Sequence, residues 1–85
     1  MVREIPIGKI THYFSKIGVA VIELNAELKL GDTIRIVGGN VDFQQIVDSM
    51  QLEHQKLEKA KIGDLVGVRV KEKVRPGYRV FKIEK

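Results

Sequence analysis

The chain has 85 residues and a mass of 9.6 kDa, which allows one small domain over residues 1–85 and excludes a complete GTPase or dehydrogenase. Its 44% hydrophobic and 31% charged residues are typical of a globular protein, and no apolar run is long enough to cross a membrane. Because there is no cysteine, disulfides and thiolate metal sites are excluded, and we expect a cytoplasmic protein. The net charge of +4 is uneven, at −2 over residues 1–54 and +6 over residues 55–85.

Alternating apolar and polar residues predict about six short strands along the chain. Ile34 and Ile36 share one face of their strand, and Val66, Val68 and Val70 share one face of another, so both faces should be buried. Residues 53–61 carry too few apolar side chains for an amphipathic helix, and we expect a loop with at most one helical turn. The predicted strands cover residues 4–14, 18–22, 33–37, 41–52, 66–70 and 78–83.

Three turns with a central glycine precede predicted strands, at Leu30-Gly31-Asp32, Ile62-Gly63-Asp64 and Pro76-Gly77-Tyr78. Glycine permits a positive φ at such a corner, and aspartate can bond back to nearby backbone N–H groups. Asp32 and Asp64 could also be regarded as a catalytic carboxylate pair. The structural interpretation is favoured, because each acid occupies the same kind of turn.

The predicted fold class is all-β. A flat sheet of six short strands would leave one apolar face and two open edges exposed to solvent. Closure into a barrel covers the apolar face and removes both edges. We therefore expect a small, closed, six-stranded and mostly antiparallel β-barrel, filled by Val, Ile and Leu side chains.

Four segments carry a family likeness, at residues 30–38, 49–54, 57–68 and 74–77. In order and spacing they resemble the second domain, a β-barrel, of the translational GTPases, and most of all the elongation factors that deliver aminoacyl-tRNA. The likeness covers about residues 7–83. It implies a closed six-stranded barrel that docks on RNA, with the GTPase chemistry in a separate domain. The chain has no Gly-x-x-x-x-Gly-Lys-Ser/Thr loop, so we expect no nucleotide binding by the chain alone.

The resemblance also implies where RNA would be contacted. In the delivery factors, the terminal adenine of aminoacyl-tRNA lies between apolar side chains, beside an acidic and a basic residue. By position, Phe14 and Ala20 correspond to the apolar wall, while Gln51 and His54 replace the acidic and the basic residue. Because these polar residues differ from the family pattern, the resemblance implies a general RNA-facing surface rather than capture of aminoacyl-tRNA.

Basic residues in the C-terminal part form the second candidate RNA site. Three of them alternate along one predicted strand and should share a face, and two more follow within a few residues. Five cations in that space can contact several phosphates. We therefore expect a non-enzymatic barrel that docks on tRNA or ribosomal RNA, including the ribosome, through a basic face, without a cofactor. The five residues are Arg69, Lys71, Lys73, Arg75 and Arg79.

Other interpretations stay open. The chain could be a protein-interaction module that binds in trans to a separately encoded enzyme or GTPase, since similar barrels are accessory domains of collagenase-like peptidases and some flavin-linked reductases. It could also be a five-stranded oligonucleotide-binding barrel, but the short turn at residues 38–40 leaves no room for the helix usual in that fold. A metal site is not expected, because His12 and His54 lack an evident third ligand.

Overall fold

The computed structural model of the chain describes residues 2–84, which form ten β-strands and no helix. Residues 1 and 85, the ends of the predicted domain, lie outside this description, and within it no helix is long and apolar enough to span a membrane. The strands are β1 (Arg3–Phe14), β2 (Val19–Leu24), β3 (Leu28–Lys29), β4 (Thr33–Gly38), β5 (Val41–Ile46), β6 (Met50–Leu52), β7 (Gln55–Leu57), β8 (Lys59–Ala60), β9 (Leu65–Arg69) and β10 (Arg79–Glu84).

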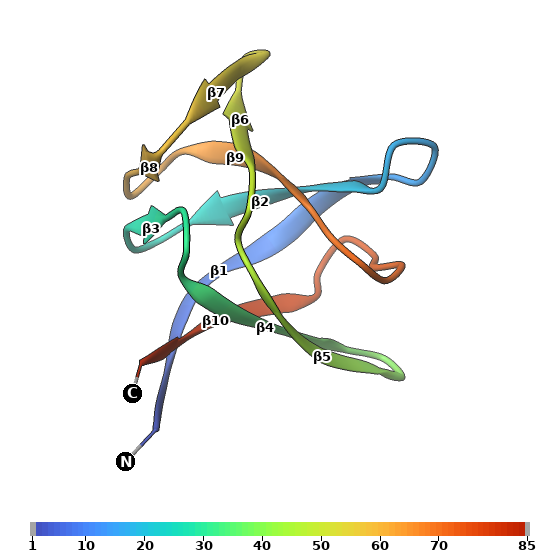
Figure 1. Cartoon of the computed structure of the whole chain (residues 1–85). Helices are drawn as coiled ribbons and strands as arrows, with labels where there is room; N and C mark the ends of the chain where they lie inside the picture. The colour runs from blue at the N-terminus through green and yellow to red at the C-terminus, as the bar shows by residue number, and fades with distance from the viewer. Residues whose placement is uncertain (1, 85) are drawn as a thin grey trace.

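Eight of these strands form one antiparallel sheet in the order β5-β4-β10-β1-β2-β9-β6-β7, and β3 pairs with β8 separately. Figure 1 shows this sheet curving strongly, with β5 and β7 at its two ends and the start of β1 paired with the end of β10. The all-β, antiparallel part of the predicted fold class is therefore confirmed.

The strand predictions are correct for five of six segments and incomplete for the sixth. The segment 41–52 contains two strands, β5 and β6, because residues 47–49 carry the chain across to the other end of the sheet. The loop predicted over residues 53–61 is wrong, since it contains β7 and β8. Glu53 and His54 make the tight turn between β6 and β7 with positive φ angles of 50° and 67°. The sequence gives little sign of this turn, because neither residue is a glycine.

One apolar core fills the inside of the curved sheet. Ile34 and Ile36 are fully buried, as are Val66 and Val68, and Val70 is 6% exposed, so the predicted buried faces are confirmed. The other buried residues come from nearly every strand: Ile7, Ile10, Ala20, Ile22, Leu24, Leu28, Phe43, Val47, Met50, Ala60, Val74 and Val80.

The three predicted glycine turns have nearly the same geometry. Gly31, Gly63 and Gly77 have φ angles of +90°, +91° and +94°, a conformation that L side chains rarely adopt. The carboxylates of Asp32 and Asp64 each accept a hydrogen bond of 2.9 Å from the backbone N–H three residues earlier. Each carboxylate is therefore engaged in its own turn, which explains its position without a catalytic role.

Closure of the barrel is the part of the fold prediction that is wrong. The sheet ends at β5 and β7, and no strand of residues 2–84 pairs with the free edge of β5. The chain that follows β9 runs beside this edge, but β9 ends at Arg69 and the ladder does not continue. Instead, Gln45 of β5 reaches across: its Nε2 donates to the carbonyl of Arg69 at 2.7 Å, and its Oε1 accepts from the N–H of Lys71 at 2.9 Å. A side-chain amide thus stands where a closed barrel would have backbone pairing.

Candidate functional site

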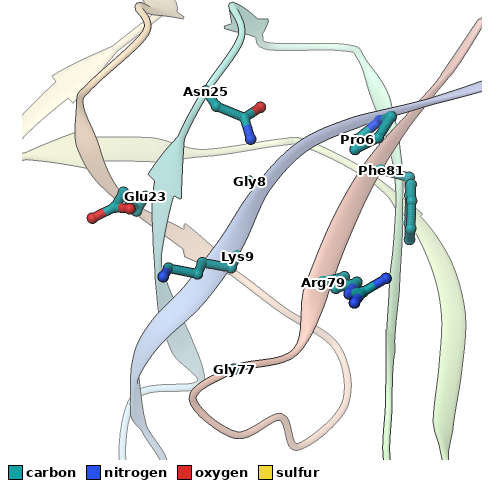
Figure 2. A pocket seen from close by; sticks show the side chains of 8 residues that line it. All are labelled: Pro6, Gly8, Lys9, Glu23, Asn25, Gly77, Arg79 and Phe81. Carbon is teal, nitrogen blue, oxygen red and sulfur yellow. The ribbon is translucent and has the colours of Figure 1, made fainter.

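A pocket of about 440 Å³ lies on the outer face of β1, β2 and β10 (Figure 2). Gly8 is at its centre, with the Lys9 and Glu23 side chains on one side and Arg79 and Phe81 on the other. A Cβ at Gly8 would lie 2.3 Å from the carbonyl oxygen of Glu23, so only glycine allows β1 and β2 to approach this closely. The register of β1 against β10 shifts at the same point, between Pro6 and Gly8.

This pocket is lined by two cations, Lys9 and Arg79, and by one carboxylate, Glu23. Lys9 and Arg79 are direct cross-strand partners, and like charges in that position repel one another. Lys9 also lies opposite Glu23, but within residues 2–84 no ion pair joins either cation to a carboxylate. The pocket therefore has room and charge for one small anionic group, beside the apolar ring of Phe81.

A second pocket, of about 260 Å³, lies where the end of β1 faces β2, β6 and β9. We call it the apolar groove and define it by Phe14, Ile17, Val19, Val21 and Leu65. Three of these side chains are unusually open for large apolar groups: Phe14 is 51% exposed, Ile17 62% and Leu65 49%. Exposed apolar side chains gathered in a groove mark a surface that can bind an apolar partner.

Gln51 and His54 line the same apolar groove, so the structure brings together the three residues that the resemblance placed in one site, Phe14, Gln51 and His54. The ring of His12 stacks against that of Phe14, with centroids 6.4 Å apart and planes 9° from parallel. Ala20, the other residue assigned to the apolar wall, is fully buried and does not line the apolar groove.

The five basic residues predicted to form one RNA-binding face do not all share a face, because Arg79 lies apart from the other four. Arg69 and Lys71 line one pocket, Lys73 and Arg75 line a second, and Arg79 lines the pocket of Figure 2. In the sheet, β1 and β2 separate the strand of Arg79 from the strand of Arg69. The prediction failed because β9 ends at Arg69, and the alternation of side chains holds only as far as a strand continues.

Two pockets lie along the unclosed part of the sheet, between β5 and residues 69–76, which we call the seam. One, of about 220 Å³, is lined by Gln45, Ile46 and Asp48 on one side and residues 69–71 on the other. The other, of about 450 Å³, lies between Val41 and residues 73–76, with two tyrosines beside it. The bridge made by Gln45 is thus flanked by open space.

An ion network joins side chains of β1, β4 and β5. Arg35 of β4 donates to Asp42 of β5 through Nε at 2.7 Å and to Glu4 of β1 at 2.8 Å. The hydrogen bond from Arg35 lowers the pKa of Asp42 below its ordinary value, and the bonds to Asp42 and Glu4 raise the pKa of Arg35. This network ties three strands together on the outer surface.

Within residues 2–84 no group of three His, Cys, Asp or Glu residues is placed to hold a metal ion. His12 contacts Thr11, with 3.2 Å between Nδ1 and Oγ1, and His54 lies in the apolar groove. Both histidines adjoin the apolar groove, His54 by lining it and His12 by stacking on Phe14.

The residues of these surfaces that sequence reasoning missed include Ile17, Gln45 and Ile46. Ile46 carried a signal, because Asp42 and Gln44 precede it on the outward face of the strand and an exposed isoleucine breaks that polar pattern; it is 61% exposed. Ile17 lies in a turn, where a large apolar residue is unexpected. Gln45 could not be found, because its role depends on backbone groups far away in the sequence.

No protein-family profile matches the chain. The chain is 42% identical over 83 residues to an uncharacterized protease of Methanocaldococcus jannaschii and 39% identical over 85 residues to a collagenase of Porphyromonas gingivalis. These matches cover 96% and 98% of this chain, but the chain spans only 20% of each relative.

Solved structures show the same fold. Two crystal structures of the C-terminal domain of a candidate U32 peptidase from Geobacillus thermoleovorans align with TM-scores of 0.86 and 0.84. The first alignment covers 98% of this chain and 94% of the solved chain, at 23% identity. The second covers 88% of this chain and 95% of the solved chain, at 20% identity. The fold of the chain is therefore that of this peptidase C-terminal domain.

These findings contradict the resemblance to translational GTPases and the function drawn from it. The relatives are named protease and collagenase, so the expectations of a translation-factor barrel, of an RNA or ribosome partner, and of a non-enzymatic barrel are wrong. The alternative of an accessory module named collagenase-like peptidases, and two relatives named protease and collagenase do carry the similar segment within their own chains. Binding in trans to a separate enzyme stays a prediction. The motifs misled because they mostly encode turns before strands, and unrelated β-proteins use the same turns.

Proposed function

We propose that the chain is one domain of a U32-type peptidase and takes part in the cleavage of polypeptides. The observation that carries this proposal is the identity of 39–42%, over almost the whole chain, to proteins named protease and collagenase. The match in fold to a U32 peptidase C-terminal domain supports it. Because the chain spans 20% of these relatives, peptide-bond hydrolysis is proposed for the larger protein that they represent.

In such a protein, the apolar groove is proposed to pack against the remaining part of the peptidase. The exposed Phe14, Ile17 and Leu65 support this, since burying large apolar side chains is the main source of affinity between packed domains. The relatives are about five times as long as this chain, so a partner surface is available within one polypeptide.

A chimera tests this proposal. The matching segment of the Porphyromonas gingivalis collagenase is deleted in one variant and replaced by this chain in another, and cleavage of gelatin is measured for both. We expect the deletion to lower activity by at least about tenfold, and the chimera to recover most of it. A folded chimera no more active than the deletion would contradict the proposal.

A matched pair of substitutions then tests the groove in the chimera. Leu65→Glu should lower gelatin cleavage, because it places a charge in the packed apolar groove, while Ile62→Glu should not. Ile62 is a suitable control because it is 71% exposed and lies outside the groove. Equal losses in both variants would contradict packing through this surface.

A cytoplasmic location is kept as part of the proposal, supported by the absence of cysteine from the sequence. Cell fractionation followed by detection with an antibody to the chain tests it. Recovery of the protein outside the cytoplasm would contradict it.

A further inference from the structure

We propose that the seam binds an extended, acidic polypeptide segment, which pairs with β5 and completes the sheet. The inference rests on the proposed function, because it names the polypeptide class that a peptidase domain would hold. Four observations carry it: an unpaired strand edge, a side-chain amide in the place of a backbone partner, open space along the seam, and an excess of positive charge.

The unpaired edge belongs to β5. Val47, directly after β5, donates from its N–H to Asp32 at 2.8 Å and accepts from the N–H of Gly31 at 2.9 Å, so its backbone faces β4. Backbone groups alternate in direction along a strand, so those of Gln44 and Ile46 face away from β4, toward the seam. Such an edge is the surface to which an extended peptide adds as a further strand.

The Gln45 side chain shows what kind of partner the opposite edge accepts. A carboxamide carries the same donor and acceptor as a peptide group. Gln45 places this group between the carbonyl of Arg69 and the N–H of Lys71, with bonds of 2.7 and 2.9 Å. An incoming peptide strand would offer these two backbone groups the same bonds, so Gln45 can be displaced without leaving either group unpaired.

The seam also has space for side chains of an added strand. The pocket of about 220 Å³ near Ile46 and the pocket of about 450 Å³ near Val41 lie at the two ends of β5. Ile46 is 61% exposed and so offers an apolar contact to a side chain in the first of them. The partly buried Tyr13 and Tyr78 line the second. The two pockets therefore suit an added strand in which apolar side chains alternate with charged ones.

The charge of the seam favours an acidic partner. Residues 69–75 contain four cations, Arg69, Lys71, Lys73 and Arg75, against the single acid Glu72. On the β5 side, Asp42 is already paired with Arg35, which leaves Asp48 as the acid nearest the smaller pocket. Positive charge therefore exceeds negative charge along the seam, which favours association with Glu or Asp side chains.

The test uses the whole 85-residue chain and a synthetic peptide of about eight alternating Glu and Val residues, the length of an ordinary strand. NMR titration should shift the signals of Gln44, Ile46 and Lys71, and the bound peptide should slow hydrogen exchange at the Gln44 and Ile46 amides. The matching Lys and Val peptide should bind at least about tenfold more weakly, because its charges are repelled.

Backbone pairing is tested by Gln44→Pro, which removes an N–H that faces the seam while leaving the ladder with β4 intact. We expect peptide affinity to fall about tenfold, and Gln44→Ala, the control, to keep it. Gln45→Ala should instead raise affinity severalfold, because the peptide no longer has to displace the Gln45 bonds. If Gln45 only supports the fold, the affinity of Gln45→Ala for the peptide should be unchanged or lower, and this result would contradict the proposal.

The charge contribution is tested by Arg69→Gln with Lys71→Gln, which should weaken binding of the acidic peptide at low salt by at least about fivefold, because two attractive charges are lost. The control removes the same charge from the pocket of Figure 2, with Lys9→Gln and Arg79→Gln, and should leave the affinity unchanged. Equal effects of the two double variants would overturn the proposal.

Several results would assign the seam differently and overturn the proposal. One is that the NMR signals shifted by the peptide are confined to the apolar groove, and another is that the acidic and basic peptides bind equally well. The others are preferential binding of an oligouridylate RNA at the seam and self-association of the chain through Gln44 and Ile46. Failure of the proposed function is distinguishable, since a chimera inactive on gelatin leaves peptide binding at the seam unaffected. Conversely, if the chimera is active but the chain binds no peptide, the seam proposal is rejected and the proposed function stands.

Discussion

Two parts of the same sheet enclose the core in different ways. On one side, β4, β10, β1, β2 and β9 are joined strand to strand by backbone pairing, which we call the paired wall. On the other side, at the seam, β5 and residues 69–71 are joined by the two hydrogen bonds of one glutamine side chain. Val47 and Val70, which adjoin the seam, are nevertheless buried, so the core is covered on both sides.

The difference teaches that burial of the core does not require complete backbone pairing. Apolar contacts are roughly proportional to buried area and do not depend on direction, whereas a ladder requires each backbone group to meet its partner. A sheet can therefore keep its stability in the paired wall and retain unpaired backbone groups at the seam. Such groups are free to recognise another polypeptide.

The largest effect is expected in the paired wall, from Gly8→Ala. The new Cβ would lie 2.3 Å from the Glu23 carbonyl oxygen, so β1 and β2 must separate, and we expect a loss of about 3 kcal/mol in the free energy of unfolding. Urea denaturation measures it. Gly67→Ala is the control: its Cβ would meet a Val19 methyl group at 3.2 Å and the Gln51 carbonyl oxygen at an ordinary contact distance of 3.8 Å, and the cost should stay below about 1 kcal/mol. Similar costs in the two variants would show that β1 and β2 do not approach closely at Gly8.

A smaller effect is expected at the seam, from Gln45→Ala. Two hydrogen bonds are lost, but the groups left behind can reach water, so the free energy of unfolding should fall by only about 1 kcal/mol. Gln44→Ala, whose side chain makes neither bond, should change stability by less than about 0.5 kcal/mol. A loss at Gln45 as large as that at Gly8 would mean that the seam is a principal support of the fold.

The smallest effect is expected at Asp42 and depends on pH. The hydrogen bond from Arg35 holds the pKa of Asp42 below its ordinary value of 3.8, so Asp42 stabilises the fold above that pH, and this contribution is lost as the pH falls through the lowered pKa. Wild type should therefore exceed Asp42→Asn in urea midpoint near neutral pH, with the gap closing under acid conditions. In an Arg35→Gln background the gap should disappear. A gap independent of pH would contradict this role of Arg35.

Local features of this fold could be predicted from the sequence because their causes are local. The turns at Gly31, Gly63 and Gly77 were correctly predicted, since the positive φ, and in the first two turns the aspartate bond, arise within four residues. The buried faces of β4 and β9 followed from alternation alone. These same turn sequences produced the mistaken family, because they record how strands are joined rather than what the surface does.

The seam could not be predicted, because its cause is not local. Closure depends on whether β9 continues past Arg69 along β5, and Gln45 lies 24 and 26 positions away from its two partners. The apolar groove likewise required the fold to bring the turn at Ile17 against Leu65. The hairpin of β6 and β7 was missed because its turn residues, Glu53 and His54, are not the usual ones.

Hydrogen exchange of the free chain tests the difference between the paired wall and the seam most directly. The amides of Ile22 and Val66 lie in strands that are paired on both sides, whereas those of Gln44 and Ile46 face the seam. We expect exchange at Gln44 and Ile46 to be at least about 100-fold faster than at Ile22 and Val66. Equal protection of all four amides would mean that backbone hydrogen bonds close the barrel and that no edge is available for a peptide.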